Sequence, residues 1–476
     1  MKHYLIVDLG TGNTRVALVS SDGKILGIRT FTNTYYKDEF YPDAQFFVPE
    51  EWKKKIFRCC SELCSHFPNI RIDAVSSAGA RQSIVLLDKA GNAFYGLPNI
   101  DNRGKAYMDG IPQKEKIYCL SGKWVTEDFC AAKILGLSKQ RPELYGQIDK
   151  IISLSEWIGY IFTGNAVMEP SQACETQLYD IEKKNWSDEL CSAYSIKKDI
   201  LPPLVSAGTA LGPVKKDLAE TFNMDDEAVF IVGGADTQIA LRQAPVSVGD
   251  IGIVSGTTSP IVTISEHRNY DFRQRVWEDV DLGGANYLEE MNPGVTGLNY
   301  QRVKAILCPD LSYDDLEQIY KAKNKFYCIA SFSTLSFYER KALRQGGFFM
   351  PSPFDSNADR ADMCYAVLAD IACSVYEHLY RLIDFTKTGK KYLIGFGGGF
   401  QSQALCQMTA DLSGYEVRLY KGYEQATVQG LIKVCNAFFN IENDIDSNYF
   451  FYSPKANSLV LDYYPVWLKN RNIINS

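Results

Sequence analysis

The chain has 476 residues, of which 46% are hydrophobic and 22% are charged, and its formal net charge at pH 7 is −7. This length predicts two or three domains, and this composition excludes a largely disordered chain. The acidic balance argues against sequence-independent binding to nucleic acid, which needs a basic surface. No apolar run is long enough to span a bilayer and the opening residues do not resemble a signal peptide. We therefore expect a cytoplasmic protein without a nucleic-acid or membrane partner.

The chain opens with a predicted β-meander. The apolar run at residues 4–7 predicts a strand that ends in the turn Asp8-Leu9-Gly10-Thr11-Gly12. The alternating pattern at residues 15–19 predicts a second strand, and Asp22-Gly23 is typical of a hairpin turn into a third strand at residues 24–31. An acid and a Gly-Thr-Gly turn thus lie at the first bend of the domain.

Further elements follow in the first half of the chain. A second hairpin is predicted from residues 84–87 and 93–95, and helical patterns cover residues 52–66, 131–140 and 155–162. A later apolar strand at residues 229–232 leads through Gly233-Gly234-Ala235-Asp236 into a helical pattern at residues 237–241. Asp236 therefore lies where a strand gives way to a helix.

The opening pattern recurs at mid-chain. A strand at residues 250–254, the turn Ser255-Gly256-Thr257-Thr258-Ser259 and a returning strand at residues 260–264 repeat the order strand, Gly/Thr turn, strand. Such a repeat suggests two related α/β domains that face one cleft. Because Ala244-Pro245 breaks the helix that follows Asp236, we place the boundary there, which predicts domains at residues 1–245 and 246–476.

A third glycine cluster lies late in the chain. Residues 392–396 read as a strand, Gly397-Gly398-Gly399 follow, and residues 402–412 read as a helix. A strand, a glycine run and a helix let the backbone approach a nucleotide closely. The tail at residues 436–476 is rich in aromatic and Asn residues, so we expect it to be ordered, although the sequence assigns it no role.

Cysteine and histidine usage does not favour a metal site. The thirteen cysteines are an odd number, and no C-x-x-C or H-x-x-x-H pair occurs among them and the four histidines. Cys59, Cys60 and Cys64 lie in the helical pattern at residues 52–66, where small apolar packing is the expected role. We expect reduced thiols and no structural metal.

The three turns have the chemistry of a phosphate site. Gly10, Thr11 and Gly12 offer backbone N–H groups and a hydroxyl at the first bend, and Gly256-Thr257-Thr258 offers the same in the second half. Asp8, at a strand end, can hold Mg²⁺ through water. Each turn alone reads as an ordinary tight turn, but the three together favour a nucleotide site.

Candidate catalytic and substrate residues each have two interpretations. Asp236 fits an N-cap carboxylate, and it equally fits a general base that accepts a hydroxyl proton during phosphoryl transfer. Arg81-Gln82 and Asp101-Asn102-Arg103 lie at strand ends, where they can bind the hydroxyl groups of a small ligand or simply face solvent.

Taken in order, these motifs resemble the FGGY carbohydrate kinases of the actin, Hsp70 and hexokinase superfamily, over residues 5–434. Gly233-Gly234-Ala235-Asp236 resembles the motif of the family's catalytic base. The other matches are Asp8 to Gly12, Leu86 to Asn92, Lys133-Ile134-Leu135 with Pro142-Glu143, Leu154 to Gly164 with Trp186, Gly256 to Thr258, Gly397 to Gly399 with Gln407 and Gly414, and Glu424 with Gly430. Gly136 departs from the family's usual tryptophan, and Phe400-Gln401 and Leu405 depart from its usual adenine-side residues.

The resemblance implies an α/β fold with two actin-like, ribonuclease H-like domains and a central cleft. It implies transfer of the ATP γ-phosphate, with Mg²⁺, to a hydroxyl of a sugar or polyol. Asp236 would be the base and Asp8 the acid on the magnesium side. The residues implied for the nucleotide are Asp8, Gly10, Thr11, Gly12, Asn13, Gly256, Thr257, Thr258, Gly397, Gly398 and Gly399, and those implied for the sugar are Arg81, Gln82, Asp101 and Asp236.

The departures bear on the substrate. Arg81 and the pattern Asn99-x-Asp101-x-Arg103 are similar to the autoinducer-2 kinases, which phosphorylate a short linear dihydroxy-dione, whereas many ketopentose kinases carry Met-His at the positions of Arg81-Gln82. An autoinducer-2-type kinase is the first expectation, and a xylulose or other polyol kinase is the second. A sensor without catalysis is a third interpretation, which the presence of both Asp8 and Asp236 disfavours. The sequence leaves a homodimer open.

Overall fold

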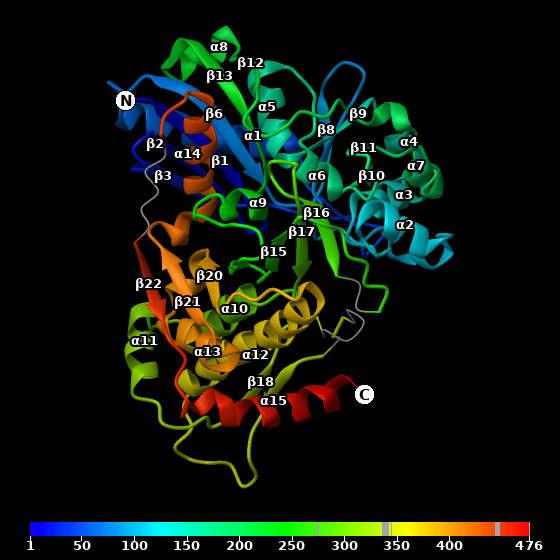
Figure 1. The fold of residues 1–476 in the computed structure, drawn as a ribbon. Coiled ribbons are helices and arrows are strands. Elements are labelled where there is room, and N and C mark those ends of the chain that lie inside the picture. Colours follow the sequence, from blue (N-terminus) through cyan, green and yellow to red (C-terminus); the bar gives the residue numbers. More distant parts are fainter. Residues whose placement is uncertain (274–275, 336–341, 344, 443–447, 476) are drawn as a thin grey trace. The chain divides into compact units, whose positions relative to one another are not determined.

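The computed structural model describes residues 1–476 except 274–275, 336–341, 344, 443–447 and 476. The chain forms two compact units (Figure 1). Unit 1 consists of Met1–Gln243, Glu278–Tyr287 and Thr427–Ile445, and unit 2 of Ala244–Trp277, Leu288–Ala426 and Asp446–Ser476. The division after Gln243 lies next to the boundary expected from the sequence, but two later segments join unit 1. The first of these segments is bound to the rest of unit 1 through its backbone, because the Glu278 N–H donates to the Gly122 carbonyl at 3.0 Å.

A mixed six-stranded sheet forms the centre of unit 1, with the strand order β12-β13-β6-β1-β2-β3. The pairs β1–β6 and β6–β13 are parallel, and the other three pairs are antiparallel. The strands are β1 (His3–Leu9), β2 (Asn13–Ser20), β3 (Ile25–Thr32), β6 (Ile72–Gly79), β12 (Ala210–Pro213) and β13 (Met224–Ala235). The parallel pairs bring the carboxyl ends of β1, β6 and β13 to one edge of the sheet.

Helices cover both faces of this sheet because apolar residues occupy both sides of β1. Leu5 and Val7 belong to a core with Trp52 of α1 (Pro49–His66). Tyr4 and Ile6, which point the other way along the strand, belong to a second core that includes α14 (Ala426–Phe438), drawn in orange beside the blue strands in Figure 1. A strand that is buried on both faces reads as an unbroken apolar run, as residues 4–7 do.

A second layer of unit 1 follows β6. Its three-stranded sheet has the order β8-β7-β9, from β7 (Ile84–Leu87), β8 (Ala93–Leu97) and β9 (Lys150–Ser153). Its helices are α2 (Lys114–Ser121), α3 (Cys130–Gln140), α4 (Pro142–Tyr145), α5 (Leu154–Thr163), α6 (Pro170–Cys174), α7 (Asp188–Ala193) and the 3₁₀ turns η1 (Lys105–Gly110) and η2 (Lys198–Ile200). The remaining elements are β4 (Tyr36–Lys37), β5 (Gln45–Phe46), β10 (Tyr179–Asp180), β11 (Asn185–Trp186), α8 (Lys216–Thr221) and α9 (Asp236–Leu241).

Unit 2 repeats the meander of unit 1 within its own sheet. Strands β15, β14, β20, β21 and β22 are neighbours in that order, and β14 pairs antiparallel with β15 and parallel with β20. The strands of this part of the chain are β14 (Ile251–Val254), β15 (Ile261–Ser265), β16 (Trp277–Val280), β17 (Tyr287–Met291), β18 (Ile329–Ser331), β19 (Gly347–Phe349), β20 (Tyr392–Phe396), β21 (Glu416–Tyr420) and β22 (Tyr449–Tyr452). Of these, β16 belongs to unit 1 from Glu278 onward. The helices are α10 (Gly297–Leu307), α11 (Tyr313–Lys321), α12 (Arg360–Thr386), α13 (Gln403–Ser413) and α15 (Leu459–Asn475), with the 3₁₀ turns η3 (Gly398–Gln401) and η4 (Tyr423–Gln425).

The sequence assigned no role to residues 436–476; of these, 443–447 and 476 lie outside the described residues, and α15 belongs to unit 2. Trp467 of α15 is fully buried, and its indole N–H donates to the Asp370 carboxylate of α12 at 2.8 Å. Arg471 donates to the Ser331 hydroxyl at 3.1 Å and to the Ser333 carbonyl at 3.0 Å. The tail therefore stabilises the packing of this unit. Over the described residues, none of the helices combines the length and apolar character needed to cross a bilayer.

Candidate active site

Asp8 lies at the carboxyl end of β1, opposite Arg15 of β2. Its side chain is 5% exposed, and its carboxylate accepts a hydrogen bond from the Arg15 guanidinium at 3.0 Å. Burial raises the pKa of Asp8, and the Arg15 charge opposes this shift. The parallel partner of Asp8 on β6 is Ala78, a small residue. Asp8 is thus a buried carboxylate at the sheet edge where β1 and β6 end.

The predicted phosphate turn after β1 is held by hydrogen bonds from residues outside it. The Gly10 N–H donates to the Asn13 carbonyl at 3.1 Å. The Asn33 amide donates to the Gly10 carbonyl at 2.7 Å, and the Asn99 amide donates to the Thr11 hydroxyl at 2.7 Å. These bonds hold the turn in one conformation.

Asp236 is the first residue of α9, directly after β13. The N-cap residue of α9 is Ala235, so the N-cap interpretation of Asp236 does not describe the structure. The partly buried Asp236 carboxylate accepts a hydrogen bond from the Thr237 N–H at 2.7 Å. Burial raises the pKa of Asp236 to about 6, the Arg81 charge lowers it and the Asp8 charge raises it. A carboxylate with this pKa can accept and release a proton near neutral pH.

The backbone before Asp236 depends on glycine and on a buried support. A Cβ atom on Gly233 would lie 1.9 Å from the Ser77 carbonyl oxygen of β6, so only glycine allows the two strands to approach this closely. The Ala235 N–H donates to the Ser171 hydroxyl at 3.0 Å, and the Ser171 N–H donates to the Glu169 carboxylate at 2.7 Å. These contacts hold the end of β13 in place.

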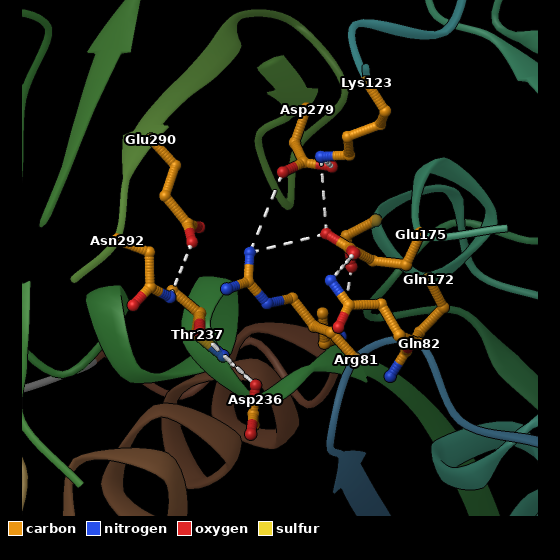
Figure 2. A network of polar contacts seen from close by, with 12 residues as sticks. Arg81, Gln82, Lys123, Gln172, Glu175, Asp236, Thr237, Asp279, Glu290 and Asn292 are labelled. Atoms are coloured by element: carbon orange, nitrogen blue, oxygen red, sulfur yellow. Dashed lines mark hydrogen bonds and ion pairs between the residues drawn. The ribbon is translucent and has the colours of Figure 1, made fainter. Parts of the chain in front are cut away.

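Arg81 and Gln82 follow β6 and contact one carboxylate, Glu175 (Figure 2). The Arg81 guanidinium lies 3.4 Å from one Glu175 oxygen, and the Gln82 amide donates to the other at 2.9 Å. Gln82 has a φ of 61°, an uncommon value for a residue other than glycine. Glu175, which no sequence motif marks, therefore positions both Arg81 and Gln82, the two residues expected at the sugar site.

Lys123 and Asp279 complete this group, and the sequence analysis missed both of them. The Arg81 guanidinium lies 3.8 Å from the Asp279 carboxylate. The Lys123 ammonium lies 2.5 Å from Asp279 and 3.4 Å from Glu175. We call Arg81, Lys123, Glu175 and Asp279 the charge cluster, and Figure 2 shows it near Asp236. The side chains of Lys123, Glu175 and Asp279 are at most 1% exposed.

The members of the charge cluster control each other's protonation. Burial favours the neutral form of Glu175, but the charges of Lys123 and Arg81 outweigh it and lower its pKa. Burial raises the pKa of Asp279, and the charge of Lys123 opposes this shift and favours the carboxylate form. Burial lowers the pKa of Lys123, but the charges of Asp279 and Glu175 outweigh this effect, so its pKa is raised.

Asp101 lies in a different set of contacts. It has no exposed surface, and one carboxylate oxygen accepts from the Arg103 guanidinium at 2.7 Å. The other oxygen accepts from the Gln45 N–H at 2.9 Å. Its expected role at the sugar site stays a prediction, and in this structure its carboxylate is part of a buried ion pair.

In unit 2 the two predicted nucleotide turns lie side by side at Ser255. Ser255 follows β14, and the Gly399 N–H donates to its carbonyl at 3.0 Å. Gly397 has a φ of 89°, and a Cβ atom there would lie 2.5 Å from the Ser255 carbonyl oxygen. The Thr257 carbonyl accepts from the Thr296 N–H at 3.1 Å, which holds the Gly256-Thr257-Thr258 turn. The two turns therefore form one continuous backbone surface.

Three glycines of the predicted nucleotide turns are not required by the fold. Gly12, Gly256 and Gly398 have no neighbouring atom within 4 Å of the position a Cβ would take, and none has a φ in the left-handed region. By contrast, Gly397 and Gly399 are crowded. Glycine in open space leaves the backbone accessible for close approach by a ligand.

The donor set fits a magnesium ion that keeps most of its water. In the part of the chain that the structure describes, no group of three or more His, Cys, Asp or Glu side chains is arranged to hold a metal ion. Mg²⁺ that is bound together with a nucleotide needs only one or two carboxylates, because water and phosphate supply the other ligands. Asp8 and Asp236 are two such carboxylates, and the charge of Asp8 acts on Asp236.

Comparisons with known sequences agree on one family. The model of the FGGY family of carbohydrate kinases, N-terminal domain, matches residues 3–242. The putative sugar kinase YoaC of Bacillus subtilis is 37% identical over 100% of this chain and 98% of that protein. Xylulose kinase of Lactococcus lactis is 27% identical over 88% of this chain and 84% of its own. Autoinducer-2 kinase of Salmonella choleraesuis is 26% identical over 50% of this chain and 46% of its own.

Solved structures share the whole fold. Xylulose kinase from Lactobacillus acidophilus has a TM-score of 0.83 at 18% identity, covering 100% of this chain and 99% of that one. Gluconate kinase from the same organism has a TM-score of 0.82 at 18% identity, and the match covers 100% of this chain and 98% of that one. The α/β, two-domain, actin-like fold expected from the sequence is confirmed. The chain belongs to the FGGY family of carbohydrate kinases and is a phosphotransferase that acts on sugars.

Proposed function

We propose that this kinase transfers the γ-phosphate of ATP, with Mg²⁺, to a hydroxyl group of a small linear sugar or polyol. The observation that carries the proposal is the environment of Asp236, a partly buried carboxyl group with a pKa raised to about 6 near Arg81. A base of this strength suits phosphoryl transfer, in which the acceptor must be oriented more than it must be deprotonated.

The roles proposed for the residues follow from this reaction. Asp236 accepts the proton of the acceptor hydroxyl, whose oxygen forms a bond to the γ-phosphorus. The bond from that phosphorus to the bridging oxygen breaks, and ADP leaves. When bound, Mg²⁺ neutralises phosphate charge, and Asp8 would hold it through water. The turns at Gly10 to Asn13 and Gly256 to Thr258 would hold the phosphates, and Gly397 to Gly399 would lie along the adenosine.

The first candidate acceptor is the linear dihydroxy-dione of the autoinducer-2 kinases. Arg81-Gln82 and the pattern Asn99-x-Asp101-x-Arg103 support it, as does the similarity to an autoinducer-2 kinase over half of the chain. The second candidate is xylulose or another ketopentose or polyol. The similarity to a xylulose kinase over 88% of the chain supports this second candidate.

The test is ADP release from Mg-ATP with a panel of acceptors. The panel holds the autoinducer-2 precursor, D-xylulose, D-ribulose, L-ribulose, glycerol, erythritol and gluconate. We expect one acceptor to dominate in kcat/KM and to lose its turnover in the Asp236→Asn variant. Nucleotide binding without ADP release from any acceptor would contradict the proposal.

A further inference from the structure

We infer that the acceptor site selects uncharged sugars and polyols over sugar acids, and that Lys123 and Asp279 set this selectivity. The cations of the charge cluster are matched by carboxylates from the same chain, so a ligand carboxylate has no uncompensated positive charge to meet. The inference rests on the proposed function, because it concerns the acceptor of the same reaction.

Arg81 connects the charge cluster to the reacting group. Figure 2 shows Arg81 between the carboxylates of the charge cluster and Asp236, and its charge lowers the pKa of that proposed base. Its side chain is 9% exposed, whereas that of Lys123 has no exposed surface. Arg81 is therefore the more accessible of the two cations, and Lys123 would act on an acceptor through the shared carboxylates.

The cluster contains two cations and two carboxylates, and the pairs are shared. Glu175 and Asp279 each lie within 3.8 Å of Arg81 and within 3.4 Å of Lys123. A sugar acid near Arg81 would compete with these carboxylates and would also face the negative charges of Asp236 and Asp8. Like charges placed together are disfavoured in a buried site, where solvent screens them poorly. A hydroxyl group brings no charge and meets no such cost.

The family fold does not decide this property. Solved structures of this fold include one named a xylulose kinase and one named a gluconate kinase, whose named sugars differ in charge. Specificity therefore comes from side chains at the site. In this chain the segment Glu278–Tyr287 supplies Asp279 to unit 1.

The position of Asp279 is well determined by its surroundings. The Glu278 N–H donates to the Gly122 carbonyl at 3.0 Å, next to Lys123. Gly122 has a φ of 70°, and a Cβ atom there would lie 2.4 Å from the Glu278 carbonyl oxygen. The backbone residues that precede Lys123 and Asp279 are thus in direct contact. Because Asn has the shape of Asp, Asp279→Asn changes the charge of the pair without changing its shape.

The experiment compares acceptors that share a carbon skeleton and differ by one carboxylate, glucitol with gluconate and xylitol with xylonate, together with the best acceptor of the panel. We measure kcat/KM for each, and the affinity for each by calorimetry without ATP. In the wild-type protein we expect the best uncharged acceptor to exceed every sugar acid by about tenfold or more.

Two single variants shift the charge balance in opposite directions. The quantity compared is the kcat/KM for a sugar acid divided by the kcat/KM for the matched uncharged acceptor. Asp279→Asn leaves an excess cation and should raise this ratio in favour of the sugar acids. Lys123→Met leaves an excess carboxylate and should move the ratio away from them. The double variant restores the charge balance and should bring the ratio back toward that of the wild type. It also keeps the test valid if one of the single variants fails to fold. Lys116→Met, which breaks an ion pair with Glu189 at the surface of unit 1, is the matched control and should leave the ratio unchanged.

A sugar acid as the best acceptor would overturn the inference, and so would two single variants that shift the ratio in the same direction. The absence of ADP release from every acceptor would count against the proposed function instead. The calorimetric affinities for the matched pairs would then still decide the selectivity.

Discussion

Burial and two neighbouring charges act together on the carboxyl group of Asp236, the proposed base. Burial makes its charged form less favourable, the nearby charge of Asp8 adds to this effect, and the charge of Arg81 opposes it. The resulting pKa of about 6 lies between that of an ordinary aspartate and the range in which the carboxyl group would stay protonated at neutral pH. Two predictions follow at the residue scale, one from the charge of Asp236 and one from its pKa.

Replacing the Asp236 carboxylate by an amide of the same shape would remove the proposed base. We expect Asp236→Asn to lower kcat by roughly 10²–10⁴ while nucleotide affinity is retained, because the change acts on proton transfer. Steady-state kinetics and nucleotide titration check this. Asp226→Asn, whose side chain is 97% exposed, is the matched control. Turnover close to that of the wild type in Asp236→Asn would contradict the assignment.

The raised pKa predicts the pH dependence of the reaction. The base acts as the carboxylate, so kcat/KM should rise with pH up to about 6 and then level off, and activity should be lost as the pH falls through that value. Because the charge of Asp8 raises the pKa of Asp236, Asp8→Asn should move the acidic limb of the pH profile to lower pH. Because the charge of Arg81 lowers that pKa, Arg81→Met should move the acidic limb to higher pH. An acidic limb that has the same midpoint pH in both variants as in the wild type would show that another group titrates.

At the scale of the elements, close approaches of the backbone determine which turns can form. Gly233 allows β13 to lie against β6, and Gly397 and Gly399 allow the third glycine cluster to lie against Ser255. Gly398 lies in the same run and has no neighbour within 4 Å of its Cβ position. The fold therefore requires glycine at positions 397 and 399, whereas only a bound ligand would require glycine at position 398.

This difference predicts separable effects of two alanine substitutions. Gly397→Ala should destabilise the protein by roughly 1–3 kcal/mol, because it combines a left-handed φ with a clash against Ser255. Gly398→Ala should leave the free energy of unfolding unchanged and raise the KM for ATP. Denaturant unfolding and ATP titration of both variants check this. A Gly398→Ala protein with unchanged ATP affinity would argue against a nucleotide along this turn.

At the scale of the whole molecule, the chain contains two units with separate hydrophobic cores. The core of unit 2 is built around the 27-residue helix α12 and includes Trp467 of the tail. Unit 1 gains Glu278–Tyr287 and most of α14 from later in the chain. Because the chain leaves and re-enters unit 1, neither unit is a single continuous stretch of sequence.

Binding of Mg-nucleotide should stabilise the folded protein. At a ligand concentration of 100 times Kd, we expect a non-hydrolysable ATP analogue with Mg²⁺ to stabilise it by about 2.7 kcal/mol. EDTA should remove the Mg²⁺-dependent part of this gain, and Asp8→Asn should reduce it. Thermal unfolding with and without each component checks this. A gain that is unchanged by EDTA and by Asp8→Asn would contradict the role proposed for Asp8.

Most local features were predictable from the order of residues along the chain. The apolar run at residues 4–7, the hairpin at residues 84–95 and the helix around Trp52 occur where the periodicity placed them. The glycine motifs, read in order, indicated the family and the fold. These features depend on contacts between residues that are close in sequence, and a strand, a tight turn or an amphipathic helix has a pattern of its own.

The acceptor side of the site required knowledge of the folded chain. Glu175 and Asp279 are 94 and 198 residues away from Arg81 in sequence, and neither lies in a motif that marks it. Asp101 pairs with Arg103 in a buried position and also accepts from the distant Gln45 N–H, and its role at the sugar site stays a prediction. Ion pairs between distant segments form only after the chain has closed on itself, so no local pattern encodes them. The sequence therefore predicted the family and the glycine turns and marked Asp236 as the candidate base, whereas long-range packing determined which charges surround Asp236.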